Sequence, residues 1–398
     1  MSQFPLSGVG IVVDDQVFNP KTDDKIVDIL KELKDKSVAL LSYNDVLTDA
    51  QIKKLGDVSF ALIDWTLLAD SAGAEARQVK QEGIIRLIKA LSSMYYMPIF
   101  VFSNNDEDDI KNTLKDNDLS ADAEGSVIMV RNKSALCARD GDEMALVPEI
   151  IKWVESSLGM YVLSKWQEAS TSAKNRMFKD FADKCPAWPI PFWNAYMRDG
   201  VNPAEELTSL LCHNFAGRLP ILDIDSKKFK GTDSVTLSKK QVVDIYKQTV
   251  MIDGGSEVIS QETELHCGDV LKCEHLSQKH YLLNISCDCD CVGRMDSNVR
   301  PCFLLGQEID LAKAWSKEKG RLKQNVPSAY DIYPLFNDHI CVRFSFRHME
   351  RFSLSDMISR GMKRVARILP PYITDVRQRC SAWLQREGFP KPPLGVGG

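Results

Sequence analysis

Four apolar runs in the first third of the chain each end in polar residues, and this pattern constrains the fold more than any other feature. The run FALID ends in Asp64, VGIVVDD ends in Asp14 and Asp15, MPIFVFS ends in Ser103, and SVIMVRNK ends in Lys133. Short apolar runs of this kind are typical of strands buried on both faces of a parallel sheet. Ligands bind open α/β sheets at the carboxyl ends of the strands. We therefore expect these five side chains to meet at one edge of a sheet.

Helical segments separate these runs. Residues 19–36 begin with turn residues and then place Ile26, Ile29, Leu30 and Leu33 on one face at helical spacing. Further helices are predicted over residues 48–57, 82–96, 106–117 and 148–158, and a further strand over residues 37–42. Strands that alternate with helices predict an α/β fold with a doubly wound, parallel, five-stranded sheet. Right-handed crossovers then bring the polar strand ends to the same edge.

The residue types at this edge indicate metal-assisted phosphoryl transfer. Carboxylates that crowd together raise one another's pKa unless a cation lies between them, so Asp14, Asp15 and Asp64 predict a hard divalent ion such as Mg²⁺. Lys133 supplies a compact second cation, and Ser103 a hydroxyl that can turn toward phosphoryl oxygens. The alternative to a functional role is that each acid serves only as a structural cap at the end of its strand.

This ordered set resembles the receiver domains of bacterial two-component response regulators over residues 1–140. The resemblance implies a flavodoxin-like sheet, Mg²⁺ as cofactor and a histidine kinase as phosphoryl donor. It also implies a role for each residue: Asp64 is the phosphoacceptor, Ser103 and Lys133 contact the phosphoryl group, and the metal ligands are Asp14, Asp15, Asp64 and the backbone carbonyl of Thr66. Two positions depart from the family, because Ser134 stands where a proline usually follows the lysine and Val130 stands at the aromatic switch position.

The rest of the chain divides by pattern into three further segments. We expect a receiver domain over residues 1–155, a helical connector over 156–255, a β-rich small barrel-like domain over 256–345 and a basic helical segment over 346–398. Prolines interrupt an aromatic-rich stretch of the connector, which predicts a turn or an extended link there. Aromatic residues in this stretch are expected to form an interdomain core or a partner groove.

Cysteine and histidine residues concentrate in the β-rich segment. Such clusters are the usual chemistry of zinc sites, but the spacing here contains no CxxC pair, and CDCDC is expected to alternate sides of a strand. We therefore expect buried thiols rather than structural zinc, with a Cys-His-Asp nucleophile built on Cys287 as an alternative. The members are His266, Cys267, Cys273, His275, His280, Cys287, Cys289, Cys291 and Cys302.

Composition sets the class of protein. The net charge is -5, which gives no global reason to expect nucleic acid, and no apolar run approaches the roughly 20 residues that cross a bilayer. The first residues lack the pattern of a signal peptide, so the 11 cysteines are expected to be reduced thiols of a cytoplasmic protein. Residues 341–398 hold 11 Lys or Arg against 4 acids, whereas residues 1–140 hold 16 against 23.

Three functions are consistent with these features. The first is a phosphorelay protein in which Asp64 accepts a phosphoryl group from a histidine kinase, as a phosphoacceptor rather than a dedicated catalyst. The stretch RVARILPPYITDVRQR, together with the receiver pattern, resembles receiver-bearing proteins of Detocs-type bacterial antiphage defence systems. That resemblance implies a kinase of the same operon as partner, a sibling effector as a further one, and service as signal receiver or phosphate buffer. The alternatives are a receiver-controlled effector enzyme acting through the β-rich segment and a DNA-binding regulator.

Overall fold

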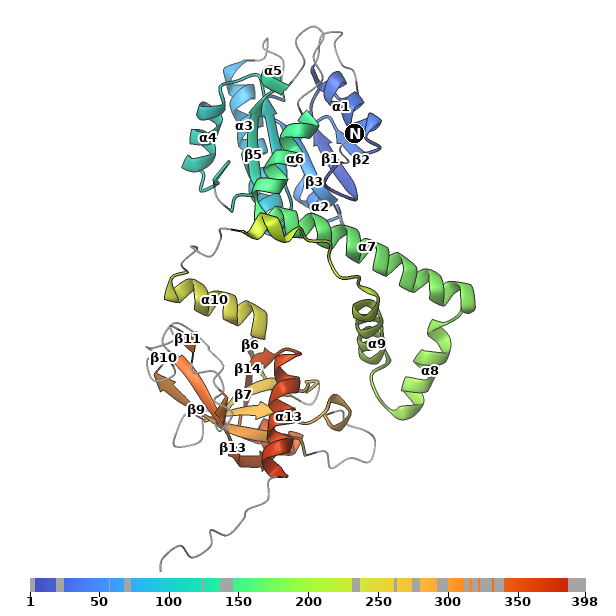
Figure 1. Cartoon of the computed structure of the whole chain (residues 1–398), viewed down its shortest axis with the longest axis vertical. Helices are drawn as coiled ribbons and strands as arrows, with labels where there is room; N and C mark the ends of the chain where they lie inside the picture. Colours follow the sequence, from blue (N-terminus) through green and yellow to red (C-terminus); the bar gives the residue numbers. More distant parts are fainter. Residues whose placement is uncertain are drawn as a thin grey trace, which may run out of the picture. The chain divides into compact units, whose positions relative to one another are not determined.

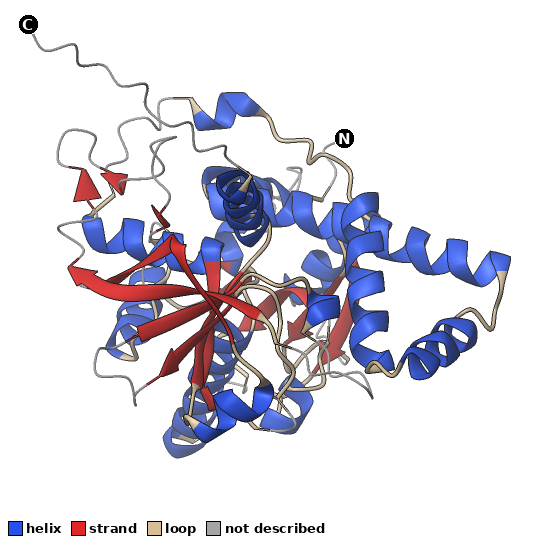
Figure 2. Cartoon of the chain, turned by 90° about the horizontal axis from the view of Figure 1, so that it is seen from below, coloured by secondary structure: helices blue, strands red, loops and turns tan. Residues whose placement is uncertain are grey.

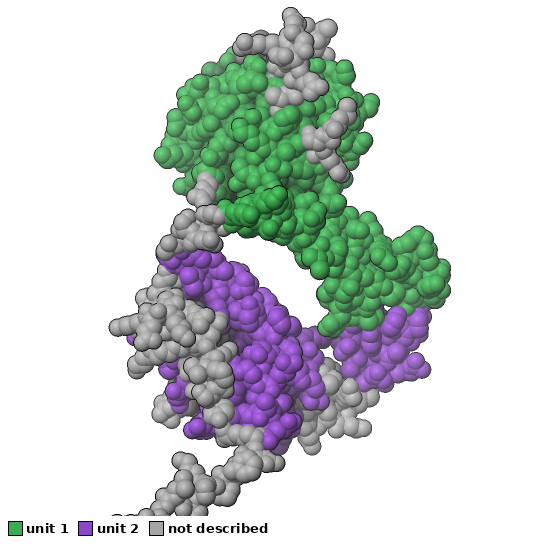
Figure 3. All heavy atoms as spheres, in the orientation of Figure 1, with its two compact units in different colours: residues 1–188, 209–232 green, residues 189–208, 233–398 purple. Residues whose placement is uncertain are grey.

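The computed structural model separates the chain into two compact units (Figure 3). Unit 1 consists of residues 1–188 and 209–232, and unit 2 consists of residues 189–208 and 233–398. No helix among the described residues is both long enough and apolar enough to cross a membrane. The four-segment division predicted from the sequence stays a prediction. The described residues are 4–18, 25–56, 58–67, 73–123, 125–136, 146–230, 237–260, 263–273, 280–291, 300–310, 315–316, 321–322, 331–332 and 340–385.

A five-stranded sheet with all strands parallel forms the centre of unit 1 (Figure 1), which confirms the predicted α/β class. The strand order is β2-β1-β3-β4-β5. Every residue of β3 is buried, as expected for the middle strand of a sheet that is covered on both faces. The strands are β1 (Val9–Val13), β2 (Ala39–Tyr43), β3 (Val58–Asp64), β4 (Ile99–Ser103) and β5 (Ile128–Asn132).

Helices cover both faces of this sheet and produce two apolar cores (Figure 1). Residues of α2, α3 and α4 pack on one face, and residues of α1, α6 and α7 pack on the other. Three residues of the apolar stripe that the sequence predicts on the first helix, Ile26, Ile29 and Leu33, are buried, and Leu30 is partly buried against the same core. The helices are α1 (Lys25–Asp35), α2 (Asp49–Ile52), α3 (Ala74–Met94), α4 (Glu107–Asp116), α5 (Lys133–Leu136), α6 (Leu146–Ser156) and α7 (Leu158–Lys184).

Local capping explains where two of these helices begin. Thr48 and Gln51 form a capping box at the start of α2. The Asp106 side chain accepts hydrogen bonds from the backbone N–H groups of Asp108 and Asp109, and the acids that follow lie in the first turn of α4. Negative charge in a first turn is favourable because of the helix dipole. The acidic run after β4 is therefore a helix start.

The connector is helical, as predicted, and proline marks its interruption. The C-cap of α7 is Cys185, and α8 begins at Pro189, a position in the first turn where the missing N–H costs nothing. None of the residues of α8 is buried, and the expected interdomain core or partner groove stays a prediction. The remaining helices of this region are α8 (Pro189–Asp199), α9 (Pro203–Arg218), a short 3-10 helix (Ser226–Phe229) and α10 (Lys239–Val250).

Unit 2 contains a seven-stranded antiparallel sheet, whose strands are red in Figure 2. The described pairings run in the open order β12-β13-β9-β8-β7-β14-β6 rather than around a closed barrel. A separate two-stranded sheet pairs β10 with β11. The strands are β6 (Met251–Val258), β7 (Asp269–Cys273), β8 (His280–Asn284), β9 (Cys302–Asp310), β10 (Trp315–Ser316), β11 (Arg321–Leu322), β12 (Asp331–Ile332), β13 (Ile340–Arg351) and β14 (Lys363–Ile368).

The predicted helical character of residues 346–398 is wrong in part. Strand β13 continues to Arg351, and residues Lys363–Ile368 form strand β14 between β7 and β6. Ala366 and Ile368 are buried at alternate positions, which is the period of a strand. Two helices complete the described part of this segment, α12 (Leu354–Ser359) and α13 (Tyr372–Leu384).

Candidate functional site

Two neighbouring strands carry three carboxylates to the same edge of the parallel sheet. Strand β1 ends one residue before Asp14, strand β3 ends at Asp64, and the two strands pair directly. Carboxylate oxygens of Asp14, Asp15 and Asp64 lie within 4.8 Å of one another. Asp14 and Asp64 are only 2% and 8% exposed. These residues form a buried acidic cluster that can bind a metal ion and is compatible with Mg²⁺.

Lys133 lies between two of these acids. Its Nζ lies 3.0 Å from Asp14 Oδ2 and 2.9 Å from Asp64 Oδ2, and the side chain is almost completely buried. Lys133 is the first residue of α5 and follows directly on β5, so the end of a third strand supplies the cation. The structure thus brings together four of the residues that the sequence singles out.

Burial and charge set the protonation of this group. Burial, together with the negative charge of Asp14, raises the pKa of Asp64 to about 7, although Lys133 and the Thr66 N–H oppose the change. For Lys133, burial favours the neutral amine, but the two carboxylates outweigh it and raise its pKa. Lys133 is therefore an ammonium ion, and Asp64 is an acid whose charge depends on what cation accompanies it.

The other two predicted residues lie beside this group. The Thr66 N–H donates to Asp64 Oδ1 over 3.2 Å, so the chain turns back toward the carboxylate directly after β3. Ser103 is fully buried at the end of β4, one residue beyond Phe102, the sheet partner of Asp64. Its Oγ accepts a hydrogen bond from the Asn105 N–H.

The two departures from the receiver pattern have clear structural settings. Ser134 lies in the first turn of α5, where its N–H donates to the Asn132 side chain over 2.8 Å. Val130 is completely buried in the apolar core between the sheet and α3. Neither residue offers an aromatic ring that can move between a buried and an exposed position.

Sequence reasoning missed the residues that hold the loops around the site. The Asn132 N–H donates to Glu107 Oε1 over 2.8 Å, and the Asn132 amide nitrogen donates to the Asn105 carbonyl over 3.1 Å. The Gln16 N–H donates to Asp14 Oδ1 over 2.8 Å. Asn132 stands between the last strand and its lysine, and this position is the signal that predicts such a linking role. The end of β5 is thereby tied to the loop that follows Ser103.

The cysteine and histidine cluster does not assemble as a thiolate site among the described residues. The expected strand at CDCDC is wrong, because Asp288–Asp290 form a 3-10 helix that Cys287 precedes as N-cap. Burial raises the pKa of Cys267 to about 11 and that of Cys291 to about 12, so both remain thiols at neutral pH. His275 lies outside the described residues, and only the backbone of His280 and Cys289 is described.

His266 instead lies beside Glu205 and Glu264, which the sequence did not single out. Its Nε2 lies 3.0 Å from Glu205 Oε1, and Glu264 adjoins the same pair. Asp288 Oδ1 accepts the Cys267 N–H over 2.7 Å and lies 3.9 Å from His266 Nδ1. The sequence does not indicate these two glutamates, because they lie far from any motif. Their sequence context predicts solvent-exposed residues of a helix and a loop.

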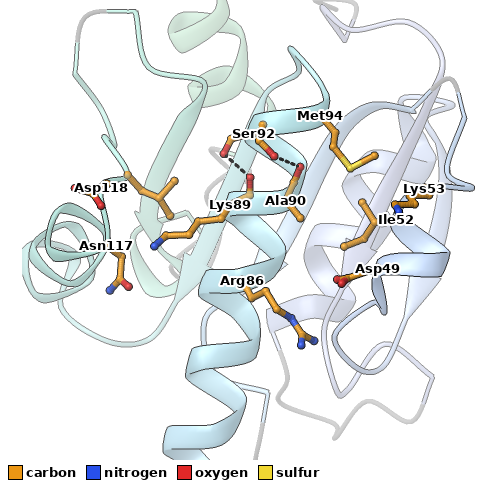
Figure 4. A pocket seen from close by; sticks show the side chains of 12 residues that line it. Asp49, Ile52, Lys53, Arg86, Lys89, Ala90, Ser92, Met94, Asn117 and Asp118 are labelled. Carbon is orange, nitrogen blue, oxygen red and sulfur yellow. Dashed lines mark hydrogen bonds between the residues drawn. The ribbon is translucent and has the colours of Figure 1, made fainter.

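A surface pocket of about 670 Å³ lies elsewhere in unit 1, beside the C-terminal half of α3 (Figure 4). Lys89 extends toward the side of Asn117, and Arg86 toward the side of Asp49 (Figure 4). None of the residues that line this pocket belongs to the acidic cluster. The cavity at the sheet edge, lined in part by Asp14, Asp64 and Lys133, has a volume of only about 10 Å³, so the side chains of the candidate site nearly fill it.

No protein-family model matches the chain, and no curated protein is similar enough to be matched.

The geometry at the sheet edge defines what the site can do chemically. Three carboxylates offer the oxygen ligands that hard divalent cations prefer, and a buried ammonium lies within ion-pair distance of two of them. Such a site can bind a divalent cation together with an anion that carries several oxygens.

Proposed function

We propose that this chain is a phosphorelay protein that accepts a phosphoryl group on Asp64 from a partner histidine kinase. The observation that carries the proposal is the contact of Lys133 with both Asp14 and Asp64 at the edge of the parallel sheet. Phosphoryl transfer requires little covalent chemistry from a protein beyond positioning and charge neutralisation. A nucleophilic carboxylate, a metal-binding acid pair and an ammonium supply these functions together.

The strand order supports the proposal. The order β2-β1-β3-β4-β5 is that of flavodoxin-like folds, in which ligands bind where the order reverses between β1 and β3. Asp14 follows β1 and Asp64 ends β3, so the acids flank this switch point. The receiver resemblance of residues 1–140 predicts the same fold and the same place for the site.

Each residue then has a role in the transfer. An Asp64 oxygen attacks the phosphorus of a phosphohistidine, the P–N bond breaks, and the leaving imidazole takes up a proton. Asp14, Asp15, Asp64 and the Thr66 carbonyl would hold Mg²⁺, which would neutralise charge on the phosphoryl oxygens. The attacking oxygen must be ionised, and the Lys133 ammonium favours that form. Ser103 offers a hydroxyl to the new phosphoryl group.

The resemblance to Detocs-type defence proteins supports a role in bacterial antiphage defence. It implies a kinase of the same operon as donor and a sibling effector as a further partner. Val130 and Ser134 replace the residues through which receivers usually relay phosphorylation, and their settings favour storage of the phosphoryl group over an aromatic switch. We infer that the chain acts as signal receiver or phosphate buffer.

Phosphotransfer tests this function directly. The full chain is incubated with the kinase encoded beside it, Mg²⁺ and radiolabelled ATP, and the label on the chain is followed with time. The wild type should be labelled, and Asp64→Asn should not. Asp116→Asn, a change at an exposed acid at the end of α4, is the matched control and should be labelled like the wild type. Equal labelling of wild type and Asp64→Asn would refute the proposal.

A further inference from the structure

Three side chains of types that commonly ligate metals converge in unit 2. Glu205 lies in the first turn of α9, and Glu264 and His266 lie in the segment that precedes β7. One ligand atom of each residue lies within 4.8 Å of the others, and His266 Nε2 lies 3.0 Å from Glu205 Oε1. All three side chains retain contact with solvent, so an ion can reach them.

The segment that carries Glu264 and His266 is fixed to the antiparallel sheet. Asp269 Oδ2 accepts the His266 N–H over 2.8 Å, and the Asn284 amide nitrogen donates to the His266 carbonyl over 2.8 Å. Arg364 Nη1 donates to the Glu264 carbonyl over 2.9 Å. Asp269 and Asn284 are both completely buried. An ion that binds here therefore meets ligands that are already ordered.

A single asparagine connects this segment to α9. The side-chain Oδ1 of Asn202 accepts a hydrogen bond from the Ala204 N–H over 3.1 Å, and its Nδ2 donates to Glu264 Oε1 over 2.6 Å. The same side chain thus orients one carboxylate and caps the helix turn that carries Glu205. A metal ligand that is itself held by a hydrogen bond is the usual arrangement in metal sites.

The three side chains present two kinds of donor atom to one point. His266 Nε2 lies 3.0 Å from Glu205 Oε1, and a carboxylate oxygen of Glu264 lies within 4.8 Å of both. Imidazole nitrogen and carboxylate oxygen are common ligands of divalent transition metals.

The donor set selects the class of ion. One imidazole nitrogen and two carboxylate oxygens suit Zn²⁺ and neighbouring divalent transition metals, whereas Mg²⁺ and Ca²⁺ prefer oxygen alone. Three protein ligands leave one position of a tetrahedral ion open to water. We propose that Glu205, Glu264 and His266 bind a divalent transition-metal ion of the Zn²⁺ class.

Zinc binding by the full chain tests the site. The purified protein is stripped with a chelator, and Zn²⁺ affinity and stoichiometry are measured by calorimetry and equilibrium dialysis in excess Mg²⁺. His266→Ala and Glu205→Gln should each weaken Zn²⁺ binding by more than about 100-fold, because loss of even an outer partner costs 10- to 100-fold. Glu205→Gln preserves the shape of the side chain, so it remains informative if His266→Ala perturbs the fold, which circular dichroism monitors.

Matched controls separate this site from its surroundings. Glu206→Gln changes the next acid of the same helix turn, and His213→Ala removes an exposed histidine of α9; both should bind Zn²⁺ like the wild type. If His266→Ala and Glu205→Gln bind Zn²⁺ as tightly as the wild type, the proposal is wrong.

Discussion

Lys133 Nζ lies 2.9 Å from Asp64 Oδ2, and the two side chains are only 6% and 8% exposed. The same nitrogen lies 3.0 Å from Asp14 Oδ2, so one buried cation serves two buried acids. A buried ion pair stabilises a protein little in comparison with apolar packing, but the loss of one member leaves an uncompensated charge. The contact therefore compensates part of the charge of the two acids and holds them close together.

Loss of the Lys133 ammonium should show how strongly the stability of the protein depends on a cation beside Asp14 and Asp64. Lys133→Met keeps the apolar length of the side chain but leaves Asp14 and Asp64 unneutralised, so we expect the free energy of unfolding to fall by about 3–5 kcal/mol without metal. Added Mg²⁺ should restore part of it. Urea unfolding with EDTA and with Mg²⁺ measures both values. Lys111→Met, which removes a half-exposed partner of Glu107 and Asp122, should cost less than about 1 kcal/mol and show no metal effect.

The raised pKa of Asp64 predicts a pH-dependent stability with a definite sign. The folded protein holds a proton on Asp64 up to about pH 7, whereas the ordinary pKa of the group is 3.8. Between these values the folded state binds more protons, so the contribution of Asp64 to stability falls as the pH rises. Asp64→Asn removes this pH-dependent contribution. The free energy of unfolding of the variant minus that of the wild type should therefore be higher at about pH 8 than at about pH 5. Urea unfolding in EDTA checks this; an equal difference at both pH values would contradict it.

Asp15 offers a selective test of metal binding. Its carboxylate takes no part in the Lys133 contacts and accepts a hydrogen bond only from the Gln16 side chain among the described contacts. Asp15→Asn should therefore change the melting temperature little without metal. Mg²⁺ binding raises the stability of the folded state by mass action, and this increase should be lost in the variant. Thermal melts over a Mg²⁺ series measure it, with Asp49→Asn as a control that keeps the full increase.

The parallel sheet and its site could be predicted because each strand carries its own signal. Uniform burial makes a parallel strand an uninterrupted apolar run, and the first polar residue after the run marks the carboxyl end. Asp14, Asp64 and Lys133 meet because three such ends share one edge. Which strands lie next to each other follows from the strand order of the sheet, and no single apolar run contains that information.

Strand β14 could not be predicted because its partners are remote. Arg364 and Arg367 are separated by two apolar residues. This spacing also fits a helix that ends before the two prolines that follow. Both arginines reach the completely buried Asp269, over 3.1 Å and 2.6 Å, and this acid lies about 95 positions earlier in the chain. An arginine in a sheet is acceptable when such a partner neutralises it. The sequence does not reveal which acid that is.

The setting of Val130 predicts that the aromatic switch cannot be restored by substitution. Its side chain is fully buried among apolar residues of the sheet and α3. Val130→Tyr inserts a ring and a hydroxyl into this packed core, so we expect a loss of about 1–3 kcal/mol in the free energy of unfolding. Val130→Ile, a smaller enlargement, should cost less. Urea unfolding compares the two, and a stable Val130→Tyr protein with an exposed ring would show that the site tolerates a switch.

The turn before β7 should be intolerant of any side chain. Gly268 has a φ of +91°, and a Cβ there would lie 2.2 Å from the Ile368 carbonyl oxygen of β14. Gly268→Ala must therefore separate the turn from the strand, and the strained φ alone costs about 1–3 kcal/mol. Gly255 also has a positive φ, +62°, but nothing lies within 4 Å of its Cβ position. Gly255→Ala should thus lose about 1–2 kcal/mol from conformation alone, and Gly268→Ala clearly more. Equal losses in urea unfolding of the full chain would contradict the close packing of Gly268 against β14.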